Sequence, residues 1–305
     1  MYQEFYRDIP GSQFFKKLYR LPSIFPQETV YRVERKTSET VLLTLSPPDT
    51  IEKKREEFKA LRRFYSLGIP MPYPQDMGLC GEGRYLYTLS SDVKGEPAAK
   101  ALSAFTPMRQ YEFGTSAGQI LRKIHSLSLR ESYEWGPHFQ DVTDHCLSSY
   151  SDCGNKLEQE EIFLRFIKQS RPFLYERPIR LLHGAFGPQN LFITSHQTLA
   201  VTGFSFQNGD PWTDFCMLPD WGFSPFFCSG LMDGYFSHRH IPMEFFRLTA
   251  FYLAVDTLAA FSWAAARSGE AADAVRQRAG ILRKWYQDFH SMIPSWYQSA
   301  KRGLG

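Results

Sequence analysis

The sequence lacks a strong excess of charge of either sign. It carries 35 Lys and Arg residues against 32 Asp and Glu residues, which gives a formal net charge of +3. Proteins that bind nucleic acid present clustered basic residues to the phosphates. The most basic stretch, residues 53–63, is interleaved with Glu56 and Glu57 and is typical of a solvated helix face. We therefore expect no nucleic-acid partner.

The sequence also lacks a long hydrophobic run. Its longest apolar region, residues 250–266, is interrupted by Asp256, and a membrane-spanning helix needs about 20 predominantly apolar residues. This region predicts a buried helix instead. Residues 1–9 carry charges and no apolar stretch, so they do not resemble a signal peptide. The expectation is a cytoplasmic protein with no membrane partner.

Cysteine is scarce. The five cysteines stand at positions 80, 146, 153, 216 and 228, an odd number with irregular spacing. A disulfide framework is expected in small secreted domains with paired cysteines, and this chain does not fit that pattern. His145, Cys146 and Cys153 lie close in sequence, but no Cys-x-x-Cys pair supports a metal site. Free thiols are the simpler interpretation.

Apolar side chains are plentiful, at 43% of the residues, and aromatic residues make up 16%. Residues 1–95 are predicted to form a β-rich lobe. Residues 30–34 and 39–45 are apolar, β-branched runs joined by a polar turn, which indicates a hairpin. Residues 51–67 have apolar side chains at helical spacing, and residues 85–89 favour another strand.

Residues 96–305 are predicted to form a mostly helical lobe. Gly95 to Pro97 is expected to be a turn between the lobes, and Thr106 followed by Pro107 is typical of a helix start. Further helices are expected at residues 157–169, 242–267 and 270–293, and short strands at 191–194 and 199–204. A strand-rich lobe followed by a helical lobe makes an α+β protein.

One segment carries a specific resemblance. Residues 181–216 read LLHGAFGPQNLFITSHQTLAVTGFSFQNGDPWTDFC. They resemble the catalytic core of the aminoglycoside phosphotransferase and choline kinase family, where His-Gly-Asp is followed by Asn, by a strand ending in Asp, and by Gly-Asp-Pro and a further Asp. Weaker agreement is found at residues 57–61, 68–72 and 119–126. The resemblance implies a two-lobed protein-kinase-like fold, with a small antiparallel sheet and a larger lobe that holds the catalytic-loop hairpin and the acceptor-site helices.

The same resemblance implies a reaction. Transfer of the γ-phosphoryl group of ATP depends on positioning and charge neutralisation. In the family, the first Asp orients the substrate hydroxyl, the Asn and the second Asp hold Mg²⁺, and a strand Lys paired with a helix Glu binds the phosphates. Each of these positions is identifiable in this sequence.

Several of the reacting positions are substituted. Ala185 stands where the family has its base, and it has no group to accept a proton. His183 is retained, either to shape the loop or as an acid/base. Asn190 is also retained, either as a metal ligand or as a residue that bonds only its own loop. Ser205 is the nearest counterpart of the second Asp, in a strand without an acid.

The remaining positions are mixed. Asp210 is a candidate replacement metal ligand or a turn acid that caps the next helix. The family counterpart of Asp214 buttresses the catalytic loop. Thr44 stands where the family has its phosphate-binding Lys, so Glu57 is left without an obvious partner. Residues 22–29 contain no glycine, which disfavours close approach of the backbone to phosphates.

An aromatic run follows the motif. It comprises Trp212, Phe215, Trp221, Phe223, Phe226, Phe227, Tyr235 and Phe236, flanked by Asp220 and Asp233. In the family this region carries the acceptor site, where aromatic rings would stack on a sugar or enclose a cationic amine. The alternative is that these rings are core residues.

Three hypotheses follow. The preferred one is a family member without kinase activity that binds a small molecule or a partner protein and needs no cofactor. The rival is an active small-molecule hydroxyl kinase in which Asn190 and Asp210 hold Mg-ATP. The third is a structural protein of unrelated fold, in which the match at residues 181–216 is accidental.

Overall fold

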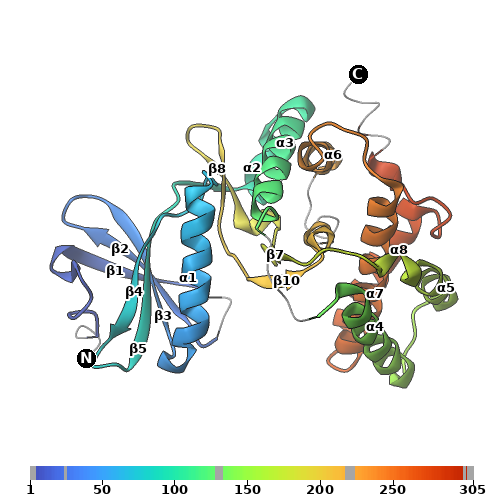
Figure 1. Cartoon of the computed structure of the whole chain (residues 1–305), viewed down its shortest axis with the longest axis horizontal. Helices are drawn as coiled ribbons and strands as arrows, with labels where there is room; N and C mark the ends of the chain where they lie inside the picture. The colour runs from blue at the N-terminus through green and yellow to red at the C-terminus, as the bar shows by residue number, and fades with distance from the viewer. Residues whose placement is uncertain (1–4, 24–25, 128–132, 217–223, 298–299, 301–305) are drawn as a thin grey trace. The chain divides into compact units, whose positions relative to one another are not determined.

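The computed structural model describes residues 5–23, 26–127, 133–216, 224–297 and 300 of the 305-residue chain (Figure 1). Contacts divide the chain into two compact units. Unit 1 comprises residues 1–96 together with residues 192–202, and unit 2 comprises residues 97–191 together with residues 203–305. The hairpin that follows the candidate catalytic loop thus belongs to unit 1, although its sequence neighbours lie in unit 2.

Unit 1 is built on an antiparallel sheet of five strands in the order β1-β2-β3-β5-β4. The strands are β1 (Phe15–Leu21), β2 (Thr29–Arg35), β3 (Thr40–Ser46), β4 (Pro74–Cys80) and β5 (Tyr85–Ser91). Helix α1 (Ile51–Ser66) packs beside β4 (Figure 1). A second sheet joins β6 (Gly95–Pro97), β8 (Leu191–Thr194) and β9 (Leu199–Val201). Two 3₁₀ turns, η1 (Ser12–Phe14) and η2 (Pro48–Thr50), precede β1 and α1.

The alternation of side chains along β3 explains the core of unit 1. Val41, Leu43 and Leu45 are buried, and they share one face because neighbouring side chains of a strand point to opposite faces. The N-terminal segment covers this face, with Ile9 and Phe15 in the same hydrophobic cluster. The other face of β3 carries Thr40, Leu42, Thr44 and Ser46.

Unit 2 is mostly helical. Its helices are α2 (Ala98–Ala101), α3 (Pro107–Ile124), α4 (Trp135–Asp152), α5 (Glu160–Ser170), α6 (Pro225–Tyr235), α7 (Met243–Ala265) and α8 (Gly269–Tyr286). Its short 3₁₀ helices are η3 (Leu102–Ala104), η4 (Arg171–Leu174), η5 (Pro188–Asn190) and η6 (Pro211–Phe215). Strands β7 (Arg180–Leu182) and β10 (Gln207–Gly209) pair antiparallel. This pair brackets the candidate catalytic loop.

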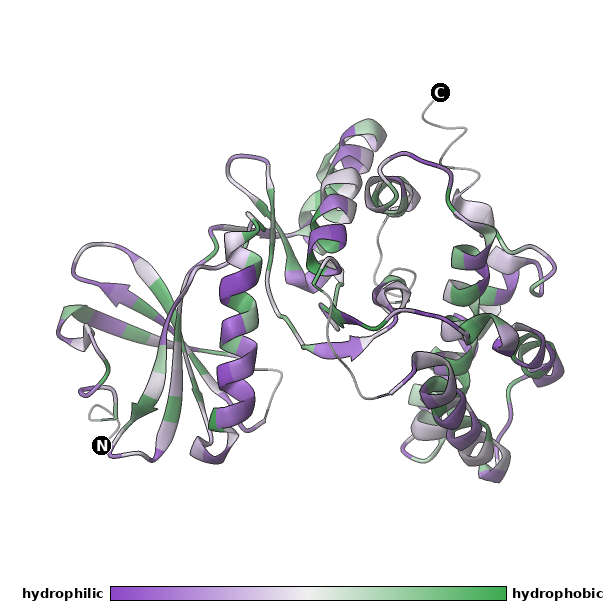
Figure 2. Ribbon diagram, viewed as in Figure 1, coloured by the Kyte–Doolittle hydropathy of each residue, from purple (hydrophilic) through white to green (hydrophobic). Residues whose placement is uncertain are grey.

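Helix α7 forms the centre of unit 2. It is long and apolar enough to cross a membrane, but 67% of its most apolar window is buried inside the protein. Figure 2 shows it mostly in the green of hydrophobic residues. A helix that is apolar around its circumference is expected in the core of a large unit. The buried helix predicted at residues 250–266 is therefore confirmed.

Glycines allow α3 and α6 to lie in backbone contact. They are Gly114 and Gly118 on α3, and Gly230 and Gly234 on α6. A Cβ atom at any of the four would lie 2.0 to 2.2 Å from a backbone oxygen of the other helix. No side chain fits in that space. The pair therefore holds α3 in place, and His125, the residue that follows α3, supports the catalytic loop.

The predicted elements are mostly confirmed, with some corrections. The hairpin of β2 and β3, the helix α1 and the Thr106 cap of α3 are found as predicted. Residues 95–97 form strand β6, not only a turn. The elements that were not predicted are strands β1, β4, β7 and β10 and helices α2, α4 and α6, and the strand predicted at residues 199–204 ends at Val201. The last helix ends at Tyr286, before residue 293, because Gln287 takes a left-handed conformation with φ of 51°.

Candidate functional site

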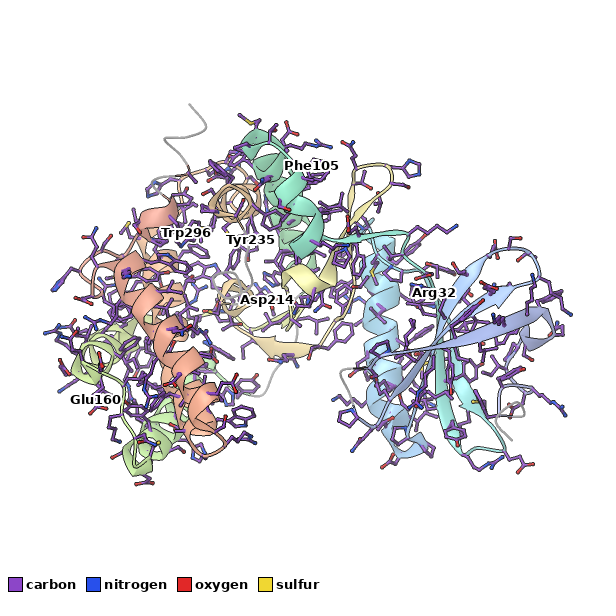
Figure 3. The ribbon with its side chains drawn as sticks, turned by 180° about the vertical axis from the view of Figure 1, so that it is seen from behind. Arg32, Phe105, Glu160, Asp214, Tyr235 and Trp296 are labelled. Atoms are coloured by element: carbon purple, nitrogen blue, oxygen red, sulfur yellow. The ribbon has the colours of Figure 1, made fainter. Side chains whose placement is uncertain are left out.

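Asp214 holds the candidate catalytic loop from within unit 2 (Figure 3). Its carboxylate accepts hydrogen bonds from the backbone nitrogen of His183 at 2.8 Å and from that of Gly184 at 2.9 Å. It is 3% exposed, so water does not compete for these bonds. Two adjacent N–H groups aimed at one carboxylate fix the direction in which the loop leaves β7. Two such bonds are what the buttressing role implied for Asp214 by the resemblance would require.

His125, just after the last residue of α3, completes this support. Its Nε2 lies 2.9 Å from Asp214 Oδ2, and its Nδ1 lies 3.0 Å from the hydroxyl of Tyr235. Burial acts to raise the pKa of Asp214. The hydrogen bond and charge of His125, together with His183, lower this pKa by more than burial raises it. The net pKa of Asp214 is below its ordinary value. The carboxylate is therefore ionised at neutral pH.

His183 is completely buried within the loop that it begins. Its Nδ1 accepts a hydrogen bond from the backbone nitrogen of Ala185 at 3.2 Å. Its ring packs against Phe186 and Phe204, with ring centroids 5.3 and 4.5 Å away. These contacts hold the imidazole as a spacer inside the turn. The geometry favours the loop-shaping interpretation of His183 over a catalytic one.

Asn190 bonds its own loop. Its Nδ2 donates to the carbonyl oxygen of Ala185 at 2.9 Å, and its backbone nitrogen donates to Gly187 at 3.0 Å. Its Oδ1 lies 2.1 Å from the position that a Cβ atom on Gly203 would occupy, and Gly203 has φ of +65°. The side chain is thus enclosed between the loop and the backbone at Gly203. Of the two roles predicted for Asn190, the structure displays the loop bond.

Ser205 is joined to the loop through its backbone. Its nitrogen donates to the carbonyl oxygen of His183 at 2.9 Å. Its own carbonyl oxygen lies 1.9 Å from the position of a Cβ on Gly184, where φ is +75°. Only glycine at position 184 permits this approach. The two segments that should carry acids are therefore close together, yet they offer a methyl group at Ala185 and a hydroxyl at Ser205.

Asp210 is fully buried and its oxygens are engaged. Arg177 donates to it from Nε at 2.7 Å and from Nη2 at 3.0 Å. Further bonds come from the Trp212 backbone nitrogen at 2.9 Å and from the Tyr252 hydroxyl at 2.7 Å. The Arg177 guanidinium also stacks on the Trp212 ring at 3.3 Å. Asp210 is the N-cap of η6, as its second predicted role requires.

In unit 1, the position of the phosphate-binding Lys has no cation. Thr44 lies in the middle of β3, opposite Val30 of β2 and Thr88 of β5. The expectation that Glu57 has no partner is wrong. Its carboxylate pairs with Lys54, one turn earlier on α1, at 3.1 Å.

Lys54 is shared between two carboxylates. Its Nζ lies 2.9 Å from Glu28, which ends the segment between β1 and β2, and 3.1 Å from Glu57. Ser46, on the same strand face as Thr44, donates to the same Glu28 oxygen at 3.2 Å. Burial acts to lower the pKa of Lys54, but Glu28 and Glu57 raise it, and the net pKa is raised. The cation is neutralised within unit 1.

The side chains at these positions do not fit Mg-ATP. Magnesium is held mainly by carboxylate oxygens and phosphates in octahedral geometry. Within the part of the chain that the structure describes, no three His, Cys, Asp or Glu side chains gather as a metal-holding group. Ala185 and Ser205 bring no charge, and Asp210 would have to release Arg177.

The aromatic run is divided by the structure. Trp212, Phe215 and Phe227 are buried and pack as core residues. Asp233 is also buried and accepts hydrogen bonds from the hydroxyls of Tyr111 and Tyr297 at 2.6 and 3.0 Å. Among the other candidates, Asp220, Trp221 and Phe223 lie outside the described residues, whereas Phe226, Tyr235 and Phe236 are partly buried.

Three participants in these networks were not found from the sequence. Arg177 is 33 positions from Asp210, in a segment with no recognisable pattern. Glu28 and Lys54 each look like ordinary surface charges in the sequence. The spacing of Lys54 and Glu57, at i and i+3 of a predicted helix, was the only sequence feature that indicated a pair, and that spacing is common on solvated helices.

Comparison with known proteins gives a consistent result. The family model described as Phosphotransferase enzyme family matches residues 26–245. No curated protein matches the chain significantly. A choline/ethanolamine kinase family protein from Mesorhizobium loti is 16% identical, with a TM-score of 0.60 over 96% of this chain and 95% of that one. The GDP complex of aminoglycoside 2'-phosphotransferase-IIIa is 12% identical, with a TM-score of 0.61 over 96% of each chain.

A third solved structure adds a nucleotide-bound relative. Amicoumacin kinase, in complex with AMP-PNP, Ca²⁺ and its ligand, is 12% identical, with a TM-score of 0.60 over 93% of each chain. At such low identity these likenesses establish the fold alone. They confirm the two-lobed kinase-like architecture predicted from residues 181–216, and they exclude the unrelated fold of the third hypothesis.

Proposed function

Because this chain belongs to the Phosphotransferase enzyme family, we propose that it retains the fold of these kinases without their phosphotransfer activity and serves as a binding protein. Its ligand would be a small molecule or a partner protein held by the helical unit. The observation that carries the proposal is the lack of charge at the two positions, Ala185 and Ser205, that should orient the hydroxyl and seat Mg²⁺.

The cost of these substitutions to a kinase is large. Loss of a general base lowers the rate by about 10²- to 10⁴-fold. Loss of metal neutralisation costs several kcal/mol of transition-state stabilisation. Asp210 does not replace the missing acid, because freeing it would leave the Arg177 guanidinium, 11% exposed, without its partner. Removing one member of a buried ion pair typically costs about 3–5 kcal/mol.

The charges of unit 1 support the same conclusion. A nucleotide-binding lobe presents free cationic charge to the phosphates. Here Lys54 is already bound by Glu28 and Glu57, whose side chains are 15% and 19% exposed. A triphosphate that approached the Lys54 ammonium group would be repelled by the carboxylates of Glu28 and Glu57. This arrangement disfavours nucleotide binding in the family's manner.

The test is a nucleotide titration of the purified chain. Thermal unfolding is followed with millimolar ATP, with and without Mg²⁺, alongside a coupled assay for ADP release. A ligand at 100 times its Kd stabilises a protein by about 2.7 kcal/mol. We expect no shift in Tm and no turnover above the background of an Asn190→Ala control.

The rival hypothesis makes the opposite prediction. If Asn190 and Asp210 hold magnesium, Mg²⁺ and ATP together would raise the Tm. ADP release would then fall to background in the Asn190→Ala variant. That pair of results would overturn the proposal and establish an active small-molecule kinase. Turnover that persists unchanged in the variant would indicate a contaminating ATPase, which supports the proposal.

A further inference from the structure

Unit 2 contains a cavity that the phosphotransfer positions do not use. It has a volume of about 770 Å³ and lies between the start of α4 and residues 175–180, which lead into β7. Ligand sites for small molecules commonly have volumes of about 300–1,000 Å³. The side chains that matter for its chemistry are Tyr133, Glu134, Trp135, Tyr175, Glu176 and Arg180.

The cavity is separate from the candidate catalytic loop. Arg180 is the first residue of β7, where it pairs with Gly209, and His183 follows the last residue of the strand. At about 3.3 Å per residue, this places the Cα of Arg180 roughly 10 Å from that of His183. The cavity thus lies at the opposite end of β7 from Ala185.

One wall of the cavity is held rigidly. Trp135 is 7% exposed, and its indole nitrogen donates to the Tyr252 hydroxyl at 2.8 Å. Tyr252 donates in turn to Asp210, which binds Arg177. The chain of bonds connects α4, α7, η6 and the segment before β7. A wall fixed in this way needs little reorganisation when a ligand binds.

Three charged side chains of the cavity are not committed to the protein. The side chain of Arg180 makes one hydrogen bond within the protein, from Nη1 to the neighbouring carbonyl oxygen of Ile179 at 2.9 Å. Within the described ranges, the rest of its guanidinium has no protein acceptor, and Glu134 and Glu176 have no cationic partner. A guanidinium binds a carboxylate with two parallel hydrogen bonds. The carboxylates of Glu134 and Glu176 can in the same way form ion pairs with an ammonium group of a ligand.

Aromatic side chains supply the apolar part of the site. Trp135 stacks on Phe139 with centroids 5.2 Å apart, which fixes the plane of its ring. Tyr175 is 57% exposed, and the Tyr133 hydroxyl donates to the carbonyl oxygen of Asn208 at 3.2 Å. Rings of this kind bury a flat or aliphatic group while remaining in contact with water at their polar ends.

We propose that this cavity binds a small zwitterion of the amino-acid type. Its carboxylate pairs with Arg180, its ammonium group lies between Glu134 and Glu176, and its side chain packs on Trp135 and Tyr175. A simple amine would leave Arg180 unpaired beside a like charge, and a simple acid would face two carboxylates. The inference rests on the proposed function, because it names the ligand of the binding protein.

The experiment is calorimetric titration with L-phenylalanine, L-tyrosine and L-tryptophan as probes. Phenethylamine and 3-phenylpropionate serve as analogues that lack the carboxylate and the amine. We expect saturable binding of at least one amino acid and at least tenfold weaker binding of the analogues. Arg180→Gln and the double variant Glu134→Gln with Glu176→Gln should each weaken binding by at least tenfold.

Matched controls separate recognition from folding. Arg276→Gln, on α8, removes a guanidinium that pairs with nearby Asp273 and lies over the Phe261 ring, and it should leave amino-acid binding unchanged. Arg180→Lys keeps the charge without the paired geometry and should bind with intermediate affinity. The Tm of each variant verifies that unit 2 is folded.

The outcomes are distinct from those of the kinase test. No binding of any amino acid, binding of phenethylamine or 3-phenylpropionate as tight as that of the amino acid, or unchanged binding by folded Arg180→Gln would overturn this inference. None of these results bears on nucleotide turnover. Conversely, ADP release that falls to background in the Asn190→Ala variant would overturn the proposed function, and the titration would then report an acceptor or effector site.

Discussion

Two sets of side chains meet at the loop of residues 183–190, and they differ in how the fold uses them. Asp214 and His125 are buried; Asp214 accepts hydrogen bonds from two backbone N–H groups of the loop, and His125 holds its carboxylate in place. Ala185 lies within the loop and Ser205 contacts it through its backbone, but their side chains make none of these bonds. The first set orders the loop, whereas the second set stands at the positions to which the resemblance assigns the reacting acids.

This difference explains how a kinase fold can persist without its acids. A carboxylate that serves only a metal ion or a substrate contributes little to folding, and strained or charged reacting groups often cost stability. Such a residue can be replaced without loss of the structure. A carboxylate that accepts two backbone N–H groups cannot be replaced in this way, because the buried donors would lose their partner. Fold membership therefore does not establish activity.

The largest effect is expected from Asp214→Ala. It leaves the N–H groups of His183 and Gly184 unpaired in the interior and His125 without its acceptor. We expect a loss of about 3–5 kcal/mol in the free energy of unfolding, as for other broken buried pairs. Urea denaturation measures it. A loss below about 1 kcal/mol would show that the loop does not depend on this carboxylate.

The same residue predicts a dependence on pH. The folded pKa of Asp214 lies below its ordinary value, so its stabilising effect is present above the unfolded pKa of about 4. It is lost as pH falls through the folded pKa. The stability difference between the wild type and Asp214→Asn should be largest near neutral pH and should narrow below about pH 4. A difference that stays constant down to acid unfolding would contradict the assignment.

A smaller loss is expected at the helix contact that carries His125. In Gly118→Ala, the new Cβ atom would lie 2.1 Å from the carbonyl oxygen of Leu231, so α3 and α6 must separate. Overpacking of this kind costs about 1–3 kcal/mol. The matched control is Gly280→Ala on α8, where nothing lies within 4 Å of the added atom. It should be neutral or stabilising by up to about 1 kcal/mol.

Sequence patterns identified the elements whose patterns are local. Strands β2, β3 and β5 have alternating or apolar runs, and α1 has apolar side chains at helical spacing. Strand β1 was missed because it is an edge strand with only Phe15 buried, so it shows no alternation. Strand β4 begins with Pro74 and contains Gly78, both of which argue against a strand.

The sequence predicted those residues of the candidate site that belong to the motif at residues 181–216. The resemblance gave the position of Asp214 and its role as a buttress, and it located Ala185 and Ser205. It gave no indication of Arg177 or of Glu28, because each reaches its partner through the fold and not through sequence spacing. Helix α4, which forms a wall of the cavity, was missed because it opens with Trp-Gly-Pro and is rich in polar, weakly helical residues.

The charge cluster of unit 1 should contribute about as much as a partly exposed ion pair. Glu28→Gln leaves Lys54 with Glu57 alone, and we expect a loss of about 1 kcal/mol in the free energy of unfolding. The folded pKa of Lys54 is raised, so this difference should persist through neutral pH and shrink only above about pH 10. Glu52→Gln, which alters an exposed pair with Arg55, is the control and should change stability less.

The smallest effect on stability is expected from Ala185→Asp. This variant also tests most directly whether positions 185 and 214 differ in their importance for the fold. The Ala185 methyl group is half-buried and accepts no bond, so an added carboxylate reaches water and should change stability by no more than about 0.5 kcal/mol. Urea denaturation beside Asp214→Ala measures this difference directly. A loss comparable to that of Asp214→Ala would show that the substituted position supports the fold after all, and that its alanine is a structural requirement. A neutral result would show that a carboxylate at position 185 is not needed for the fold, in contrast to the carboxylate of Asp214, which orders the backbone of the loop.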